Sequence, residues 1–114
     1  MANRTIAMLS NELNVIVTQI CDSITGRSNA TTQLLRACTS IGANKAEAKY
    51  GESRADFIHK MEIALKECAE TAYWLDYLYS INEIDTAIYK RAKSICGSIE
   101  RKLVASVRTA KGKT

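Results

Sequence analysis

The clearest structural pattern in the chain lies in residues 53–80, SRADFIHKMEIALKECAETAYWLDYLYS. Ser53 and Asp56 have the spacing of a capping box, in which a hydroxyl and an acidic side chain satisfy free amides at a helix start. Behind them, apolar side chains recur at steps of three and four residues, which is typical of one helix face. We therefore predict a long amphipathic helix over residues 54–80. Its apolar positions are Phe57, Met61, Ala64, Cys68, Ala72, Leu75 and Tyr79.

Three further stretches show the same periodicity. The first ends near Gly26 and predicts a helix over residues 3–25, and the second ends before Gly51 and predicts one over 30–50. The last follows Asn82, a suitable capping residue, and predicts a helix over 83–109. The apolar positions are Ile6, Leu9, Leu13, Ile16, Ile20 and Ile24, then Leu34, Leu35, Cys38, Ile41, Gly42 and Ala46, then Ile84, Ile88, Ile95, Ile99, Leu103 and Val107.

The chain of 114 residues contains no proline and only five glycines, which favours a few long helices joined by short loops. Short connections place consecutive helices antiparallel. We therefore predict one all-α domain over residues 1–114, an antiparallel up-down-up-down four-helix bundle.

The sequence also predicts where in the cell the protein resides. The N-terminal residues are too polar for a signal peptide, and the longest aliphatic run, residues 15–17, is far below the roughly 20 residues of a membrane span. A soluble, cytoplasmic protein is the expectation.

Four cysteines, Cys21, Cys38, Cys68 and Cys96, fall one per predicted helix, on or beside the apolar faces. Zinc sites normally contain close pairs of cysteine or histidine, and this sequence has neither a CxxC pair nor a second histidine beside His59. We expect four reduced core thiols, with a metal site or disulfides as the alternatives.

No catalytic constellation is visible in the sequence. His59 points about 200° away from Phe57 around its helix, so we expect a solvated side chain, with no nucleophile near it in sequence. We predict that the protein is not an enzyme and needs no cofactor.

Two polar or aromatic sectors lie off the apolar faces. Arg36, Ser40, Asn44 and Glu47 share one sector of the second helix, which is either a solvated face or a contact surface. Glu67, Glu70 and Trp74 share a sector of the third, and one helix cannot bury all the aromatic residues of 73–79. Exposed aromatic side chains usually mark contacts, so we expect a homo-oligomer.

Charge is uneven along the chain. Residues 47–89 have a net charge of −5, whereas residues 90–114 carry eight basic groups against Glu100 and have a net charge of +7. One side of the last helix is a candidate anion-binding face, although no aromatic residue is interleaved for base stacking. Its members are Lys90, Lys93, Arg101, Arg108 and Lys111.

The segment RACTSIGANKAEA, residues 36–48, resembles the signature of the four-helix-bundle proteins encoded in 23S ribosomal-RNA intervening sequences. Residues 56–58, 63–67 and 70–75 resemble a second signature of that family. The resemblance implies a bacterial up-down bundle without enzymatic activity that assembles into ring-like homopentamers. A related branch contains accessory proteins of diversity-generating retroelements, which bind reverse transcriptase and nucleic acid. The polar residues it shares with the family are Arg36, Ser40, Asn44, Glu47 and Glu70.

Two functional hypotheses remain. In the first, the chain is a non-enzymatic oligomeric module that uses the sectors of the second and third helices. In the second, it is a nucleic-acid-binding accessory protein, acting on ribosomal RNA or beside a reverse transcriptase through the basic face of the last helix.

Overall fold

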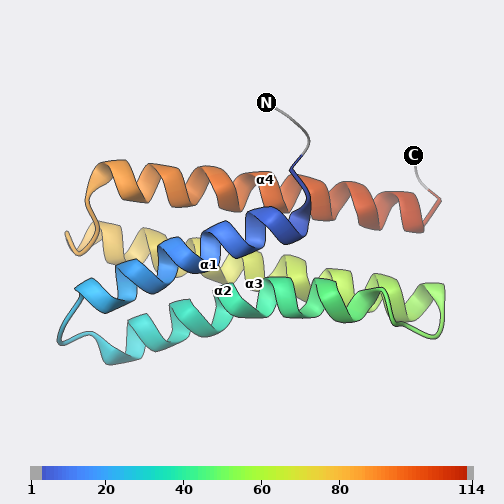
Figure 1. Cartoon of the computed structure of the whole chain (residues 1–114), viewed down its shortest axis with the longest axis horizontal. Helices are drawn as coiled ribbons and strands as arrows, with labels where there is room; N and C mark the ends of the chain where they lie inside the picture. The colour runs from blue at the N-terminus through green and yellow to red at the C-terminus, as the bar shows by residue number, and fades with distance from the viewer. Residues whose placement is uncertain (1–3, 113–114) are drawn as a thin grey trace.

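A computed structural model describes residues 4–112 of the chain. Within them are the helices α1 (Ile6–Ser23), α2 (Ser28–Ala48), α3 (Arg54–Ser80) and α4 (Thr86–Ala110). The helices run alternately in opposite directions, and α4 closes back on α1 (Figure 1). The prediction of an all-α, antiparallel four-helix bundle is confirmed. Among the four pairs of helices in contact, α2–α3 has the most extensive contact and α1–α4 the least.

Helix α3 begins and ends where the sequence predicts. The Ser53 hydroxyl accepts a hydrogen bond from the Asp56 amide at 3.1 Å, and the Asp56 carboxylate accepts one from the Glu52 amide at 3.1 Å. Helix α1 ends two residues before the predicted limit, and its predicted start at residue 3 lies outside the described part. Helix α2 begins two residues earlier and ends two residues earlier than predicted.

The predicted cap of the last helix was wrong. Asp85 caps α4 by accepting a hydrogen bond from the Ile88 amide at 2.9 Å. Asn82 instead ends α3: it has a left-handed φ of 65°, and the Glu83 amide reaches back to the Leu78 carbonyl at 2.9 Å. This is a Schellman motif, in which asparagine tolerates the left-handed conformation. Helix α4 therefore starts at Thr86 and not at residue 83.

The core largely follows the predicted stripes, with local differences on α2, α3 and α4. On α3, Thr71 and Leu78 are buried where Ala72 and Tyr79 were expected, and the Thr71 hydroxyl donates to the Glu67 carbonyl at 2.8 Å. On α2, Ala46 is exposed whereas Ala48 is buried. On α4, Ile88 remains 42% exposed, because the loosely packed α1–α4 pair leaves a groove there.

Gly42 marks the closest approach of α2 to α1. A Cβ atom placed at Gly42 would lie 2.5 Å from Ser10 Oγ, and Ser10 is itself buried. A Cβ atom at Gly97 on α4 would meet only Arg101 Nη1, at 3.4 Å. The two helical glycines therefore differ in the space around them, so the same substitution can be compared at both.

We predict that alanine affects stability differently at these two positions. Gly97→Ala should raise the free energy of unfolding by about 0.5–1 kcal/mol, because alanine is the better helix former. Gly42→Ala should leave the protein about 1–3 kcal/mol less stable than Gly97→Ala, because its methyl group overpacks the α1–α2 contact. Adding Ser10→Ala should recover part of that loss. Urea denaturation measures all three changes, and equal effects at the two glycines would contradict this packing.

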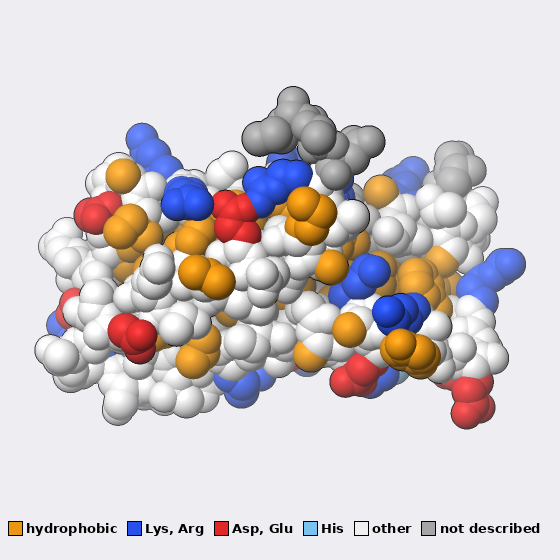
Figure 2. All heavy atoms as spheres, viewed as in Figure 1, with side chains coloured by type: hydrophobic (Ala, Val, Ile, Leu, Met, Phe, Trp, Pro, Cys, Tyr) orange, Lys and Arg blue, Asp and Glu red, His pale blue; other side chains and the backbone are white. Residues whose placement is uncertain are grey.

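Within residues 4–112, the helices lack the combination of length and apolar character that crossing a membrane requires. Figure 2 shows one face of the molecule, on which hydrophobic side chains form several small groups between charged ones.

Candidate interaction surface on α2 and α3

The two polar sectors predicted on α2 and α3 face each other across the seam between these helices. Lys60 Nζ lies 2.7 Å from Glu47 Oε1. Arg36 donates to the Glu70 carboxylate, and its Nη1 lies 3.6 Å from Glu67 Oε1. We call this set, with Ser40 and Asn44, the polar seam. The structure thus brings together the predicted residues of both helices, and these ion pairs lie within one chain.

Ser40 and Asn44 occupy the half-buried middle of the polar seam. The Asn44 side-chain amide donates to the Ser40 carbonyl at 2.9 Å, one turn back along the same helix. This bond fixes the Asn44 side chain in position. Arg36 is similarly oriented by its own helix, because its Nε donates to Gln33 Oε1 at 3.3 Å.

The charges of the polar seam contribute little to folding. The Arg36 side chain is 47% exposed, that of Glu70 is 37% exposed, and exposed ion pairs are worth roughly 0–1 kcal/mol. Glu67 is more enclosed, with 17% of its side chain exposed. Among the described residues, its Oε1 has the nearby Arg36 charge but no hydrogen bond. Two carboxylates therefore share one guanidinium, leaving a local excess of negative charge.

Aromatic side chains extend the surface along α3. Trp74 makes edge contacts with Tyr73 and Tyr77, at centroid distances of 4.9 and 5.9 Å. Tyr73 is 59% exposed and Tyr77 is 41% exposed, whereas Trp74 also packs partly against the core. We call these three residues the aromatic cluster. It forms a shallow groove with residues 26–30 at the start of α2.

The remaining aromatic residues at this end of the molecule have partners inside the chain. The rings of Tyr79 and Tyr89 stack at 3.9 Å, and the Tyr89 hydroxyl donates to Asp76 at 2.6 Å. The expectation that α3 could not bury all of its aromatic side chains is confirmed. The exposed remainder is the aromatic cluster.

The basic face predicted on α4 is partly neutralised. Lys93 pairs with Asp76 at 2.7 Å and Lys111 with Glu62 at 3.0 Å. Arg101 donates to the Ser98 hydroxyl at 3.2 Å. Lys90 and Arg108 are exposed, and no ion pair to either occurs within residues 4–112. The face is therefore less strongly charged than its sequence suggests.

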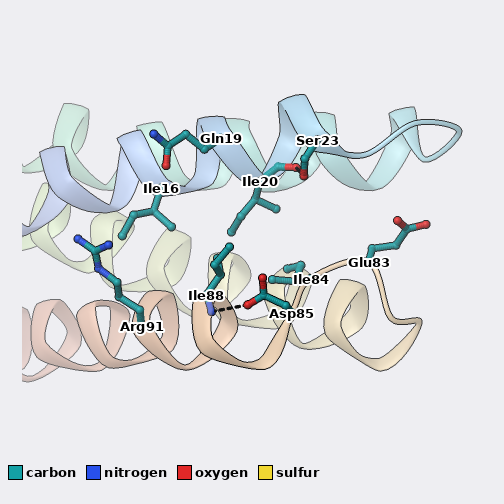
Figure 3. Close-up of a pocket in the computed structure, with 9 residues that line it drawn as sticks. All are labelled: Ile16, Gln19, Ile20, Ser23, Glu83, Ile84, Asp85, Ile88 and Arg91. Atoms are coloured by element: carbon teal, nitrogen blue, oxygen red, sulfur yellow. Dashed lines mark hydrogen bonds between the residues drawn. The ribbon is translucent and has the colours of Figure 1, made fainter.

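A groove between α1 and α4 was missed by sequence reasoning (Figure 3). Ile16 and Ile20 of α1 face Ile88 of α4, and Asp85 and Arg91 line the groove on either side of Ile88 along α4. All three isoleucines have the periodicity of core residues, so the sequence contains no signal that Ile88 stays half exposed.

The cysteines and His59 form no common site. The four cysteines are thiols, three of them buried, and burial raises the pKa of Cys38 to about 12. His59 is exposed on α3. In the part of the chain that the structure describes, histidine, cysteine, aspartate and glutamate side chains do not gather in threes suited to a metal ion.

The chain is similar to known proteins in both sequence and structure. A sequence profile described as "23S rRNA-intervening sequence protein" matches residues 4–105. One similar solved structure is a protein with unknown function from the S23 ribosomal protein family of Bacteroides thetaiotaomicron. The two chains are 34% identical, the match covers 91% of this chain and 99% of the other, and the TM-score is 0.84. No curated protein matches the chain.

Proposed function

Because the chain belongs to the 23S rRNA-intervening sequence protein family, we propose that it acts without catalysis, as a homo-oligomeric interaction module. The aromatic cluster carries this proposal. Tyr73 and Tyr77 are exposed, whereas soluble monomers rarely keep several aromatic side chains together on the surface. A ring-like pentamer is the assembly that the family resemblance suggests, and the four thiols suit a reducing cytoplasm.

The polar seam is proposed to belong to the same subunit contact as the aromatic cluster. Arg36 and Glu70 contribute little to folding, yet Gln33 and the two carboxylates of Glu67 and Glu70 hold the guanidinium in position. A fixed arginine next to aromatic side chains is the composition found at the centre of protein interfaces. In the proposed contact, the aromatic cluster supplies the buried area. The polar seam supplies the charges that set the orientation of the neighbour.

The intrinsic fluorescence of the protein tests directly whether the subunit contact lies at the aromatic cluster, because Trp74 is the only tryptophan in the chain. We predict that diluting the assembled protein shifts the Trp74 emission to longer wavelength, as water replaces the neighbouring subunit. Acrylamide quenching should increase in parallel. Emission that stays constant while the particle mass falls would place the contact elsewhere on the molecule.

Nucleic-acid binding through α4 is the second candidate function. It is favoured by Lys90, Arg101 and Arg108, which lie on one side of α4 and are not taken up by carboxylates of the described residues. Phosphate contact is the interaction that such a face offers, and it is independent of base sequence. We place it second because Asp76 and Glu62 already neutralise Lys93 and Lys111.

A further inference from the structure

Cys68 and Cys96 meet where α3 packs against α4. Their Sγ atoms lie 3.5 Å apart, and each sulfur also faces the carbonyl oxygen of the other residue, at 3.4 and 3.5 Å. The other two thiols have different partners: Cys21 lies against the Thr31 carbonyl and Cys38 against Asn14 Oδ1. The chain therefore contains one dithiol, formed by residues 28 apart in sequence.

A groove at the surface reaches the dithiol from one side. Both cysteines line it. The other lining residues are the small Ala69, Ala72 and Gly97 and the larger Tyr73, Asp76, Lys93 and Glu100. Gly97 adds no side chain to this lining, and a Cβ atom placed there would meet only Arg101 Nη1, at 3.4 Å. The two cysteines are enclosed, with Cys68 2% and Cys96 3% exposed. This enclosure favours access by small solutes over bulky thiols or disulfides.

The surroundings make the two thiols unequal. The hydrogen bond from Cys68 and the nearby Lys93 ammonium group lower the pKa of Cys96, although burial and the Glu100 and Asp76 carboxylates oppose this. The same hydrogen bond and burial raise the pKa of Cys68. Lys93 lines the groove and is held there by Asp76 at 2.7 Å. Cys96 is therefore the more acidic thiol of the pair. The thiolate is the reactive form of cysteine.

We propose that Cys68 and Cys96 form a reversible disulfide when hydrogen peroxide enters this groove. The Cys96 thiolate attacks one peroxide oxygen, the O–O bond breaks, and the departing hydroxide takes up a proton to become water. Cys68 then loses its proton and attacks the Cys96 sulfur, and the S–O bond breaks to release a second water. The two thiols together lose two electrons, and one peroxide is reduced to two water molecules. A small thiol in excess reverses the bond by exchange after local opening of the α3–α4 pair.

The cross-link would tie the middle of α3 to the middle of α4. Closing a loop of this length restricts the unfolded chain, so the midpoint of thermal unfolding should rise by roughly 5–15 °C. Strain in the native helices would place the shift at the lower end of that range.

The experiment treats the full reduced chain with hydrogen peroxide, removes the peroxide, and alkylates the remaining thiols in denaturant. We expect four alkylated thiols before treatment and two after it. Trypsin should release a linked pair of peptides, residues 67–90 joined to residues 94–101. Reduction with dithiothreitol should restore four thiols and the original melting temperature.

Two variants make the result specific. Cys21→Ser removes a thiol outside the pair, so it should form the same linked peptides and show the same rise in melting temperature. Cys96→Ser should form no linked pair and show no rise. The proposal is overturned if the native parent keeps four thiols under peroxide that oxidises the denatured chain. It is also overturned if Cys68 or Cys96 reaches the sulfinic acid without cross-linking, or if the linked peptides contain Cys21 or Cys38.

Discussion

Replacing Trp74 with alanine is expected to give a folded chain that no longer self-associates. The indole joins Tyr73 and Tyr77 into one cluster, and truncating a tryptophan at the centre of an interface to alanine weakens binding by about 2–4 kcal/mol. The dissociation constant of the assembly should therefore rise roughly 30- to 1,000-fold. Sedimentation velocity across a concentration series measures this change.

The controls separate loss of contact from loss of fold. His59→Ala changes an exposed residue of the same helix and should leave the dissociation constant unchanged. Because Trp74 also packs partly on the core, circular dichroism must show that the variant remains helical at the temperature used. Tyr77→Ser is the second variant, since Tyr77 is 41% exposed and its loss costs the fold little. If both variants assemble like the parent, the aromatic cluster is not the contact.

The second large effect concerns nucleic acid. If α4 binds it, affinity should depend steeply on salt, because each phosphate contact releases condensed counterions. For about three contacts per subunit, log affinity should fall with log salt at a slope of roughly −2 to −3, so a fourfold rise in salt weakens binding roughly 15- to 60-fold. Replacing Lys90, Arg101 and Arg108 together with glutamine should abolish most of the binding and this slope. Fluorescence anisotropy with labelled RNA and DNA measures both.

A matched control uses cations that are already neutralised. Lys93 and Lys111 are paired with Asp76 and Glu62, so changing these two lysines to glutamine should weaken binding less than the triple change. If binding survives the triple change, α4 is not the nucleic-acid surface. The same conclusion follows if the parent chain binds no nucleic acid at low salt.

The helices were predictable because their signals are local. Ser53 and Asp56 cap α3 as their spacing indicates, and the apolar stripe of α1 is buried throughout. Asn82 was misassigned because asparagine suits both a helix start and the left-handed position after a helix end. The path of the chain between α3 and α4 decides which of these two roles Asn82 takes. That path depends on the packing of both helices.

The candidate site was predictable in composition but not in its pairing. The periodicity of each helix placed Arg36 on one polar sector and Glu70 on another. It could not show that the two sectors face each other, because that depends on the rotation of α2 against α3. The contact between Cys68 and Cys96 could not be predicted for a similar reason. Each lies on the apolar stripe of its own helix, and the register of α3 against α4 brings their sulfurs together.

The mass of the parent chain in solution tests the central claim most directly. Light scattering coupled to size exclusion should give an integral multiple of the 12.6 kDa chain mass at tens of micromolar, with five chains as the assembly expected from the family resemblance. The sample is kept reduced, so that a disulfide between chains does not contribute. A strict monomer of 12.6 kDa across this concentration range would contradict the proposal that the aromatic cluster and the polar seam join copies of this chain.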